Sequence, residues 1–201
     1  MSIKPVINFC KKNFKREINV IEIGARYGDS SEVIMKNLNV SNYYIIDPYE
    51  SYEEYSIDGF NEVLKKNKNI FENTKKKLNN MFSRVNITFY KNYSNDKNII
   101  NNFENESIDL IFIDGNHEYS YVLSDLENYY PKLKKNGIIC GDDFFMRHYE
   151  NDFKRSLPLG EYPVKMVYEA VTEFKKKYNL KLLTFGNHRN YPSTYAFIKP
   201  L

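Results

Sequence analysis

The sequence predicts an α/β fold, in which one doubly wound sheet is covered by helices on both faces. The length of 201 residues, with 42% hydrophobic and 27% charged residues, suits a single compact domain. Short β-rich runs alternate with helical patterns from end to end. Several of these runs are apolar throughout, which is typical of parallel strands buried on both faces. We therefore expect one domain spanning residues 1–201, without an internal repeat or linker.

The first half of the chain shows three strands and two helices. Residues 1–18 are expected to form a helical extension before the first strand. Asp29-Ser30-Ser31-Glu32 fits a capping box and predicts the start of a short helix. Residues 50–60 are polar and rich in tyrosine, so we expect a loop there, and apolar spacing predicts a long helix from Asn61 to Phe82. The expected strands are Asn19–Ile23, Tyr43–Ile46 and Ile87–Tyr90.

The second half continues the alternation. Apolar residues at helical spacing from Val122 to Leu133 predict a helix that Pro131 and Gly137 close. A final helix is expected from Val164 to Tyr178. The turn-rich segment GNHRNYPS separates two β-rich runs and predicts a closing antiparallel hairpin. The expected strands are Ile108–Ile113, Ile138–Gly141, Leu180–Phe185 and Thr194–Ile198.

Composition excludes several classes of protein. No run approaches the roughly 18 apolar residues of a membrane span, and the N-terminus lacks the apolar run of a signal peptide. A net charge of +3 is too small to indicate a nucleic-acid binder by itself. Cys10 and Cys140 have no close cysteine or histidine neighbours in the sequence, so neither a disulfide framework nor a zinc site is expected. We expect an intracellular, cytoplasmic protein with reduced thiols.

The end of the first strand carries the first candidate site, Glu22-Ile23-Gly24-Ala25-Arg26-Tyr27-Gly28. In an open α/β sheet, ligands bind outside the carboxyl ends of the strands. Gly24 and Gly28 would allow a sharp turn and a close approach to a ligand, whereas a dinucleotide fingerprint would need a glycine between them. Glu22 suits a ligand that carries positive charge or donors. Asp47 ends the second strand and could accept hydrogen bonds from a ribose. This pattern indicates S-adenosylmethionine rather than NAD.

Three further carboxylates follow the fourth and fifth expected strands: Asp114, Asp142 and Asp143. If these strands are neighbours, the three side chains converge and repel one another unless a cation compensates. All-oxygen ligation predicts Mg²⁺ or another divalent cation. Such a cation could hold a substrate hydroxyl in line with the sulfonium methyl group.

His117 lies three residues after Asp114, on the loop that faces the same place. The pKa of a histidine lies near neutrality, so His117 could take the proton from an acceptor hydroxyl. We therefore expect His117 and Asp114 to be catalytic. His148 and His188 lie in polar loops and are assigned no role.

Several segments resemble the class I S-adenosylmethionine-dependent methyltransferases. They are VIEIGARYG, YYIIDPYE, SIDLIFIDGNHEYSYVLSDLENYYPKLKKNGIICGDDF and VYEAVTEF. The likeness is greatest to small-molecule O-methyltransferases with the signature D-G-x-H-x-Y-x-x-V-x-x-D-L, which Asp114 to Leu126 match position by position. It is interrupted mainly at residues 50–85 and 144–163.

The resemblance implies a Rossmann-like sheet of seven strands in the order 3-2-1-4-5-7-6, with the last strand antiparallel. It also implies how the cofactor lies: Glu22, Gly24, Ala25, Gly28 and Asp114 near the methionine end, Asp47 at the ribose, and Ser94 or Asn95 near the adenine. Compared with catechol and metal-dependent macrolide-sugar O-methyltransferases, Asp114, Asp142 and Asp143 fall on the metal-ligand positions. His117 falls on the position of the general base.

We expect an O-methyltransferase that acts on a hydroxyl of a sugar, glycan or other small molecule. Residues 50–60 and 144–163 are candidate acceptor loops, in which Tyr49, Tyr52, Tyr55, Tyr149 and Tyr162 could stack on a ring. The expected partners are a small-molecule or glycan acceptor and no membrane; a nucleic acid is not favoured, and the chain could form a homodimer. Alternatives are a nucleic-acid methyltransferase, a non-catalytic methyltransferase-like binding domain and an NAD-dependent oxidoreductase. A base methyltransferase would typically carry N/D-P-P-Y/F where this chain has Asp114-Gly115-Asn116-His117.

Overall fold

The computed structural model describes residues 3–50, 69–148, 161–162, 164–187 and 191–201. A seven-stranded sheet has the order β3-β2-β1-β4-β5-β9-β8, which confirms the predicted order 3-2-1-4-5-7-6. The pairs from β3 to β5 are parallel, and β9 is antiparallel to both β5 and β8. Its strands are β1 (Ile18–Ile23), β2 (Val40–Ile46), β3 (Asn86–Tyr90), β4 (Ile108–Ile113), β5 (Leu133–Gly141), β8 (Leu183–Phe185) and β9 (Thr194–Ile198).

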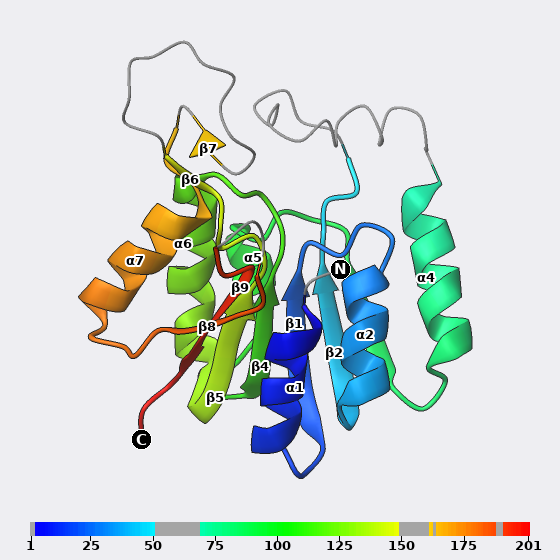
Figure 1. Ribbon diagram of the computed structural model, residues 1–201. Coiled ribbons are helices and arrows are strands. Elements are labelled where there is room, and N and C mark those ends of the chain that lie inside the picture. The colour runs from blue at the N-terminus through cyan, green and yellow to red at the C-terminus, as the bar shows by residue number, and fades with distance from the viewer. Residues whose placement is uncertain (1–2, 51–68, 149–160, 163, 188–190) are drawn as a thin grey trace.

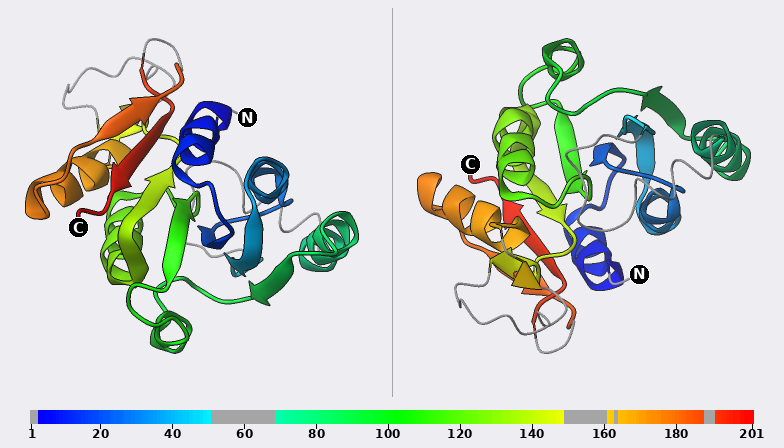
Figure 2. Two further views of the ribbon diagram at one scale, coloured as in Figure 1. Left: turned by 90° about the horizontal axis from the view of Figure 1, so that it is seen from below. Right: turned by 90° about the horizontal axis from the view of Figure 1, so that it is seen from above.

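Helices cover both faces of the sheet (Figures 1 and 2). On one face lie α1 (Lys4–Asn13), α2 (Asp29–Asn37) and α4 (Ile70–Met81). On the other lie α5 (Lys97–Asn101), α6 (Tyr119–Tyr129), followed by a short 3₁₀ turn at Tyr130–Lys132, and α7 (Val167–Lys177). A separate pair of short parallel strands, β6 (Arg147–His148) and β7 (Glu161–Tyr162), lies above α6 and α7 in Figure 1.

Each central strand contributes alternately to two hydrophobic cores, because successive side chains of a strand point to opposite faces. In β4, Leu110 and Phe112 pack in the core with α1, α2 and α4, whereas Ile111 and Ile113 pack in the core with α5, α6 and α7. All four are at most 4% exposed. The sheet is therefore buried on both faces, as its continuous apolar strands predict.

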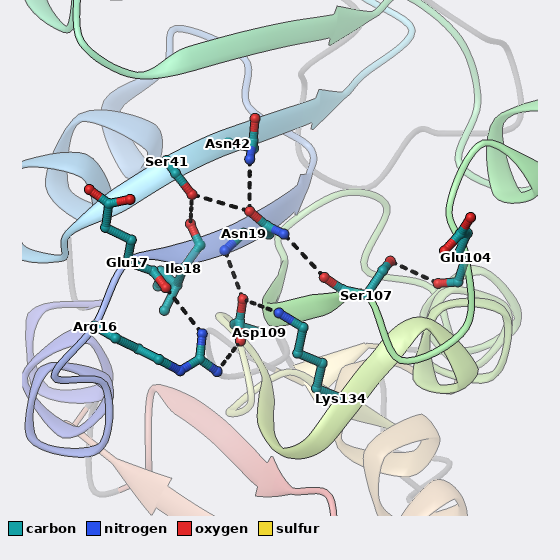
Figure 3. Close-up of polar contacts among 10 residues, drawn as sticks. All are labelled: Arg16, Glu17, Ile18, Asn19, Ser41, Asn42, Glu104, Ser107, Asp109 and Lys134. Atoms are coloured by element: carbon teal, nitrogen blue, oxygen red, sulfur yellow. Dashed lines mark hydrogen bonds and ion pairs between the residues drawn. The ribbon is translucent and has the colours of Figure 1, made fainter.

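A polar cluster ties the opposite, N-terminal ends of β1, β4 and β5 together (Figure 3). The buried carboxylate of Asp109 accepts hydrogen bonds from the Arg16 guanidinium, the Asn19 backbone N–H (2.9 Å) and Lys134 Nζ (2.9 Å). These donors lower the pKa of Asp109 against the opposing effect of burial. At the amino ends of these strands, the negative charge of Asp109 is thus balanced by the cations Arg16 and Lys134.

Several local predictions need correction. The capping box is wrong, because Gly28 is the N-cap of α2, in the left-handed conformation and without a side-chain cap bond. The last helix begins at Val167 rather than Val164, which is 44% exposed. The helix of the N-terminal extension covers only Lys4–Asn13 of residues 1–18.

The structure also differs from the expected bounds around the loops. Helix α4 begins at Ile70, and residues 61–68 of the long predicted helix lie outside the described residues. Most of the predicted loop at 50–60 and residues 149–160 of the second loop are likewise outside them, with Tyr52, Tyr55 and Tyr149. Among the described helices, none combines the length and the apolar character that crossing a bilayer requires.

Candidate active site

The carboxyl ends of four neighbouring strands are aligned by backbone hydrogen bonds that continue one residue beyond each strand. The N–H of Gly24 donates to Ile46 O (2.9 Å) and that of Asp47 to Tyr90 O (3.1 Å). On the other side of β1, the Asp114 N–H donates to Ile23 O (2.8 Å) and the Asp142 N–H to Ile113 O (3.3 Å). Residues 24, 47, 114 and 142 therefore start their loops side by side at one edge of the sheet.

The loop after β1 lies directly against the loop after β4. Gly24 has a φ of +81°, and a Cβ built on it would lie 2.2 Å from Asp114 O and 2.6 Å from Gly115 Cα. Real Cβ atoms do not approach backbone so closely, so only glycine fits. The sequence predicts that this glycine approaches a ligand; in the structure its Cα hydrogens also face the β4 loop. This contact joins the two loops.

Gly28 serves a second contact, with α4. It has a φ of +72°, and an added Cβ would meet Leu78 Cδ1 at 3.0 Å and Thr74 Cγ2 at 3.1 Å. The Thr74 hydroxyl donates to Arg26 O at 2.8 Å, and Lys77 Nζ pairs with Asp29 at 2.8 Å. Helix α4 therefore holds the glycine loop from outside the sheet.

Glu22 lies fully buried beneath this loop. Its Oε2 accepts hydrogen bonds from the Ser31 hydroxyl and, at 2.9 Å, from the Tyr43 hydroxyl. Its Oε1 is buried without a hydrogen-bond partner. Burial raises the pKa of Glu22 to about 7, although the bonds from Ser30, Ser31 and Tyr43 act in the opposite direction. Ser31, expected in a capping box, instead positions this carboxylate.

Asp47 binds the backbone of the same loop. Its Oδ2 accepts from the Ala25 and Arg26 N–H groups, both at 2.9 Å, and its Oδ1 accepts from the Tyr49 N–H at 2.7 Å. Burial raises its pKa, and these three bonds oppose that effect. The predicted ribose-binding carboxylate thus has three backbone donors in this structure. Tyr49, a predicted acceptor-stacking residue, is buried, with its ring centroid 5.1 Å from that of Phe71.

Asp114, His117 and Asp143 form a compact cluster at the ends of β4 and β5. One ligand atom of each lies within 4.8 Å of the others. His117 Nε2 is 3.1 Å from Asp143 Oδ2 and 3.7 Å from Asp114 Oδ1, and all three side chains are partly exposed. Such a group of two carboxylates and an imidazole can hold a divalent cation or exchange a proton.

The cluster differs from the predicted set of Asp114, Asp142 and Asp143. Asp142 follows β5 directly, whereas Asp143 has a left-handed backbone with a φ of +53°, and its side chain faces His117. Among the described residues, Asp142 is not part of a grouping with metal-ligand spacing. Burial and the charges of Asp114 and Asp143 raise the pKa of Asp142 to about 7. Among the described residues, the side chain that completes the group with Asp114 and Asp143 is therefore His117 and not Asp142.

Arg26 is a charged residue near the site that the sequence analysis left without a role. Burial and the charge of Asp143 raise the pKa of Asp114, whereas His117 and the positive charge of Arg26 lower it. The position of Arg26 between Gly24 and Gly28 in the sequence is the signal by which its closeness to the site could have been predicted. Through Arg26, the glycine loop supplies positive charge to Asp114, the carboxylate that follows β4.

The predicted adenine-side residues lie in the loop after β3. Ser94 bonds the carboxyl of Asp125 on α6, and Ser94 O accepts from the Tyr129 hydroxyl at 2.8 Å. Asn95 is exposed beside it. Asp125, the aspartate of the D-L pair that ends the signature, is 3% exposed and fixes this loop to α6. Sequence reasoning did not assign it that role.

A protein-family model that is described as a methyltransferase domain matches residues 21–144, more than half of the chain. The chain belongs to this methyltransferase domain family. Together with the sheet order, the match confirms the predicted class I S-adenosylmethionine-dependent methyltransferase domain.

A curated relative, the uncharacterized protein R132 of Acanthamoeba polyphaga mimivirus, is 33% identical over 132 residues. The match covers 65% of this chain and 53% of the relative, so the chain spans about half of the relative's length.

Solved structures share the fold at low identity. The O-methyltransferase NovP is 14% identical, with a TM-score of 0.64 over 98% of this methyltransferase domain and 78% of NovP. An rRNA methylase from Streptococcus thermophilus is 12% identical, with a TM-score of 0.62 over 98% and 95% of the two chains. SMU.1697c from Streptococcus mutans, solved in complex with SAH, is 13% identical, with a TM-score of 0.61 over 99% of each chain.

Proposed function

We propose that this methyltransferase domain transfers a methyl group from S-adenosylmethionine to a hydroxyl of a sugar, glycan or other small molecule, with help from a divalent cation. The observation that carries the proposal is the cluster of Asp114, His117 and Asp143, joined to the glycine loop by the contact between Gly24 and Asp114. A proton acceptor and cation ligands thus lie beside the loop assigned to the methyl donor.

The residues under the glycine loop fit a cationic donor. The unpartnered Oε1 of Glu22 is a buried acceptor, and such an atom is costly unless a ligand or a proton satisfies it. Glu22, Gly24, Ala25, Gly28 and Asp114 would surround the methionine end, with Asp47 on the ribose side and Ser94 or Asn95 on the adenine side. The aligned strand ends support this placement, because ligands of open α/β sheets bind outside them.

The donor set at β4 and β5 fits a divalent cation such as Mg²⁺. Asp114 and Asp143 would hold it, and Asp142, whose pKa these two carboxylates raise, would join them. When bound, a divalent cation offsets the clustered negative charge and lowers the pKa of a coordinated hydroxyl. His117 lies in the same cluster, so an imidazole nitrogen is within ligand spacing of the two carboxylates.

His117 is the proposed general base. It would accept the acceptor's hydroxyl proton as the oxygen–methyl bond forms and the sulfur–methyl bond breaks, leaving the demethylated thioether and a methyl ether. Asp143, 3.1 Å from Nε2, would orient the imidazole and stabilise its protonated form. The proton then passes to solvent.

The acceptor proposed is a diol, because two neighbouring hydroxyls suit bidentate binding of a cation. A glycan is the first candidate and a catechol-like phenol the second. A nucleic-acid acceptor has less support, since the net charge is only +3 and the base-methylating motif after β4 is replaced by Asp114-Gly115-Asn116-His117.

The test combines mass spectrometry with calorimetry. The protein is incubated with S-adenosylmethionine, Mg²⁺ and panels of sugars, phenols and short RNAs, and products are searched for an added methyl group. Asp143→Asn and His117→Gln should lower turnover at least 100-fold, the usual scale for losing a general base. Both should retain S-adenosylhomocysteine binding.

Glu118→Gln is the matched control, because it removes a charge from the same loop and Glu118 makes no side-chain cap bond. It should keep wild-type turnover. Absence of donor binding at millimolar concentration would overturn the cofactor assignment, full activity in EDTA would remove the cation, and methylated RNA alone would replace the small-molecule acceptor.

A further inference from the structure

Arg147, the first residue of β6, is clamped between two tyrosine rings. Its guanidinium carbon lies 4.5 Å from the ring centroid of Tyr168 and 4.0 Å from that of Tyr191. Tyr168 is in the first turn of α7, and Tyr191 precedes β9. Two distant segments of the chain thus hold one cation in a fixed orientation.

A short backbone turn joins Asp143 of the cluster to β6, which begins with Arg147. The Met146 N–H donates to Asp143 O at 2.9 Å, which closes a tight turn between Asp143 and Arg147. The Tyr168 N–H donates to Met146 O at 3.0 Å, and the Phe144 N–H donates to Ser193 O at 2.9 Å. Figure 1 shows β6 at the same end of the sheet as the loops after β4 and β5.

The start of α7 reaches the other side of the cluster as well. The Tyr119 N–H donates to Lys165 O at 3.1 Å, and Glu118 forms an antiparallel bridge with Met166. The loop with His117, the turn after Asp143 and the start of α7 are therefore one hydrogen-bonded unit. Arg147 directly follows that unit in the chain, at the end of the sheet where the acceptor is proposed to bind.

The clamp leaves the edge of the guanidinium for other contacts. Stacking occupies the faces of the group, whereas its five N–H donors lie in its plane. Nε donates a long bond to Phe145 O at 3.4 Å. Among the described residues, no carboxylate forms an ion pair with Arg147, in contrast to Arg16, which pairs with the buried Asp109. A stacked arginine with a free edge suits an anionic oxygen group, which it can bind through two parallel bonds.

We propose that Arg147 binds an anionic group, a carboxylate or a phosphate, on the acceptor. The proposal rests on the function proposed above and narrows its substrate class: the acceptor is a hydroxylated acid, with its hydroxyl at Asp114 and Asp143 and its anion at Arg147. Tyr168 and Tyr191 are positioning residues, because they orient the guanidinium.

Binding to probes that differ in the presence of one anionic group tests this proposal without turnover. Isothermal titration uses the protein saturated with S-adenosylhomocysteine and Mg²⁺. One series compares glucose, glucuronate and glucose 6-phosphate, and a second compares catechol with 3,4-dihydroxybenzoate. In at least one series an anionic member should bind at least tenfold more tightly than its neutral partner, and glucuronate against glucose 6-phosphate separates carboxylate from phosphate.

Three variants locate the effect. Arg147→Gln should remove the preference for the anion and leave the neutral probe unchanged, and Arg147→Lys should restore only part of it, because an ammonium lacks the planar fork. Lys165→Gln is the control, because it also removes one positive charge from this region of the protein. Lys165 Nζ lies 5.3 Å from the centroid of the Tyr119 ring. It should keep the preference.

The outcomes separate the two proposals. If neither series favours an anion, or if Arg147→Gln keeps the preference, the role of Arg147 is wrong, even where diols are methylated. If the preference exists and disappears in Arg147→Gln but no acceptor is methylated, the anion site stands and the proposed function fails.

Discussion

The contact between Gly24 and the β4 loop predicts a graded series of alanine substitutions. In Gly24→Ala the new Cβ would lie 2.2 Å from Asp114 O and 2.6 Å from Gly115 Cα, both backbone atoms that cannot rotate away. The left-handed φ of +81° adds about 1–2 kcal/mol of strain for an L-residue. Overpacking against rigid neighbours costs about 1–3 kcal/mol more. Gly24→Ala should therefore lower the free energy of unfolding by about 2–5 kcal/mol.

Two other glycines calibrate this value. Gly28→Ala has a similar φ of +72° but meets only side-chain carbons, at 3.0 Å and beyond, so a loss of about 1–3 kcal/mol is expected. Gly115→Ala meets Ile23 Cγ2 at 3.4 Å, an ordinary contact, and should change stability by less than about 1 kcal/mol. Urea unfolding of the three variants measures the order. Equal stabilities for Gly24→Ala and Gly115→Ala would refute the reasoning, because they lie on the two sides of the same contact.

Three further predictions concern buried polar groups. Burial raises the pKa of Asp125 from 3.8 to about 7, so as the pH rises from 4 to 8 the wild type should lose about 2–4 kcal/mol more stability than Asp125→Asn; parallel urea titrations check this, and equal pH profiles contradict it. The pKa of Asp109 is lowered, so the stability that its ionised carboxylate contributes is present above about pH 4 and is lost on acidification. Asp109→Asn should lower the free energy of unfolding by only about 1–2 kcal/mol at pH 7, because Arg16 and Lys134 are partly exposed, and the difference from the wild type should disappear in acid. Thr74→Val removes the bond to Arg26 O at nearly constant volume, and a loss of about 1 kcal/mol in urea unfolding is expected, against no loss if α4 does not hold the glycine loop.

The hydrophobic pattern of the sequence predicts most strands of the sheet well, but it does not predict the polar contacts between them. The predicted bounds of Ile108–Ile113 and Thr194–Ile198 agree with the structure, because both are β-rich runs with polar or turn residues on either side. Strand β5, in contrast, begins at Leu133 rather than at Ile138. There Leu133 pairs with Ile108 of β4 and Lys134 Nζ reaches Asp109, which is 25 residues away, so a local pattern does not show either contact.

In the candidate site, too, the positions at the strand ends are predicted from the sequence, whereas the contacts between side chains are not. The sequence places Gly24, Asp114 and Asp143 at strand ends, since the strands themselves are recognisable. Which side chains meet there depends on turns of one or two residues. The left-handed conformation of Asp143 brings it to His117, and no spacing rule predicts that Asp142 stays outside the grouping seen among the described residues. Ser31 likewise fits a capping box by sequence, yet its partner is Glu22.

Asp109 and Asp114 lie near the two ends of β4, and the difference between their surroundings supports the cation sites proposed above. Asp109 is buried, but Arg16, Lys134 and the Asn19 N–H satisfy it, so its pKa is lowered. Asp114 follows the other end of the strand, where burial and the charge of Asp143 raise its pKa, and burial is also the main cause of the raised pKa values of Asp142 and Glu22. The described residues near that end supply little compensating positive charge, chiefly that of Arg26. At Asp109 the protein itself supplies the compensating positive charge, through Arg16 and Lys134. At the carboxyl edge of the sheet, a sulfonium beside Glu22 and a divalent cation beside Asp114 would supply it instead, which is why we propose cationic ligands there.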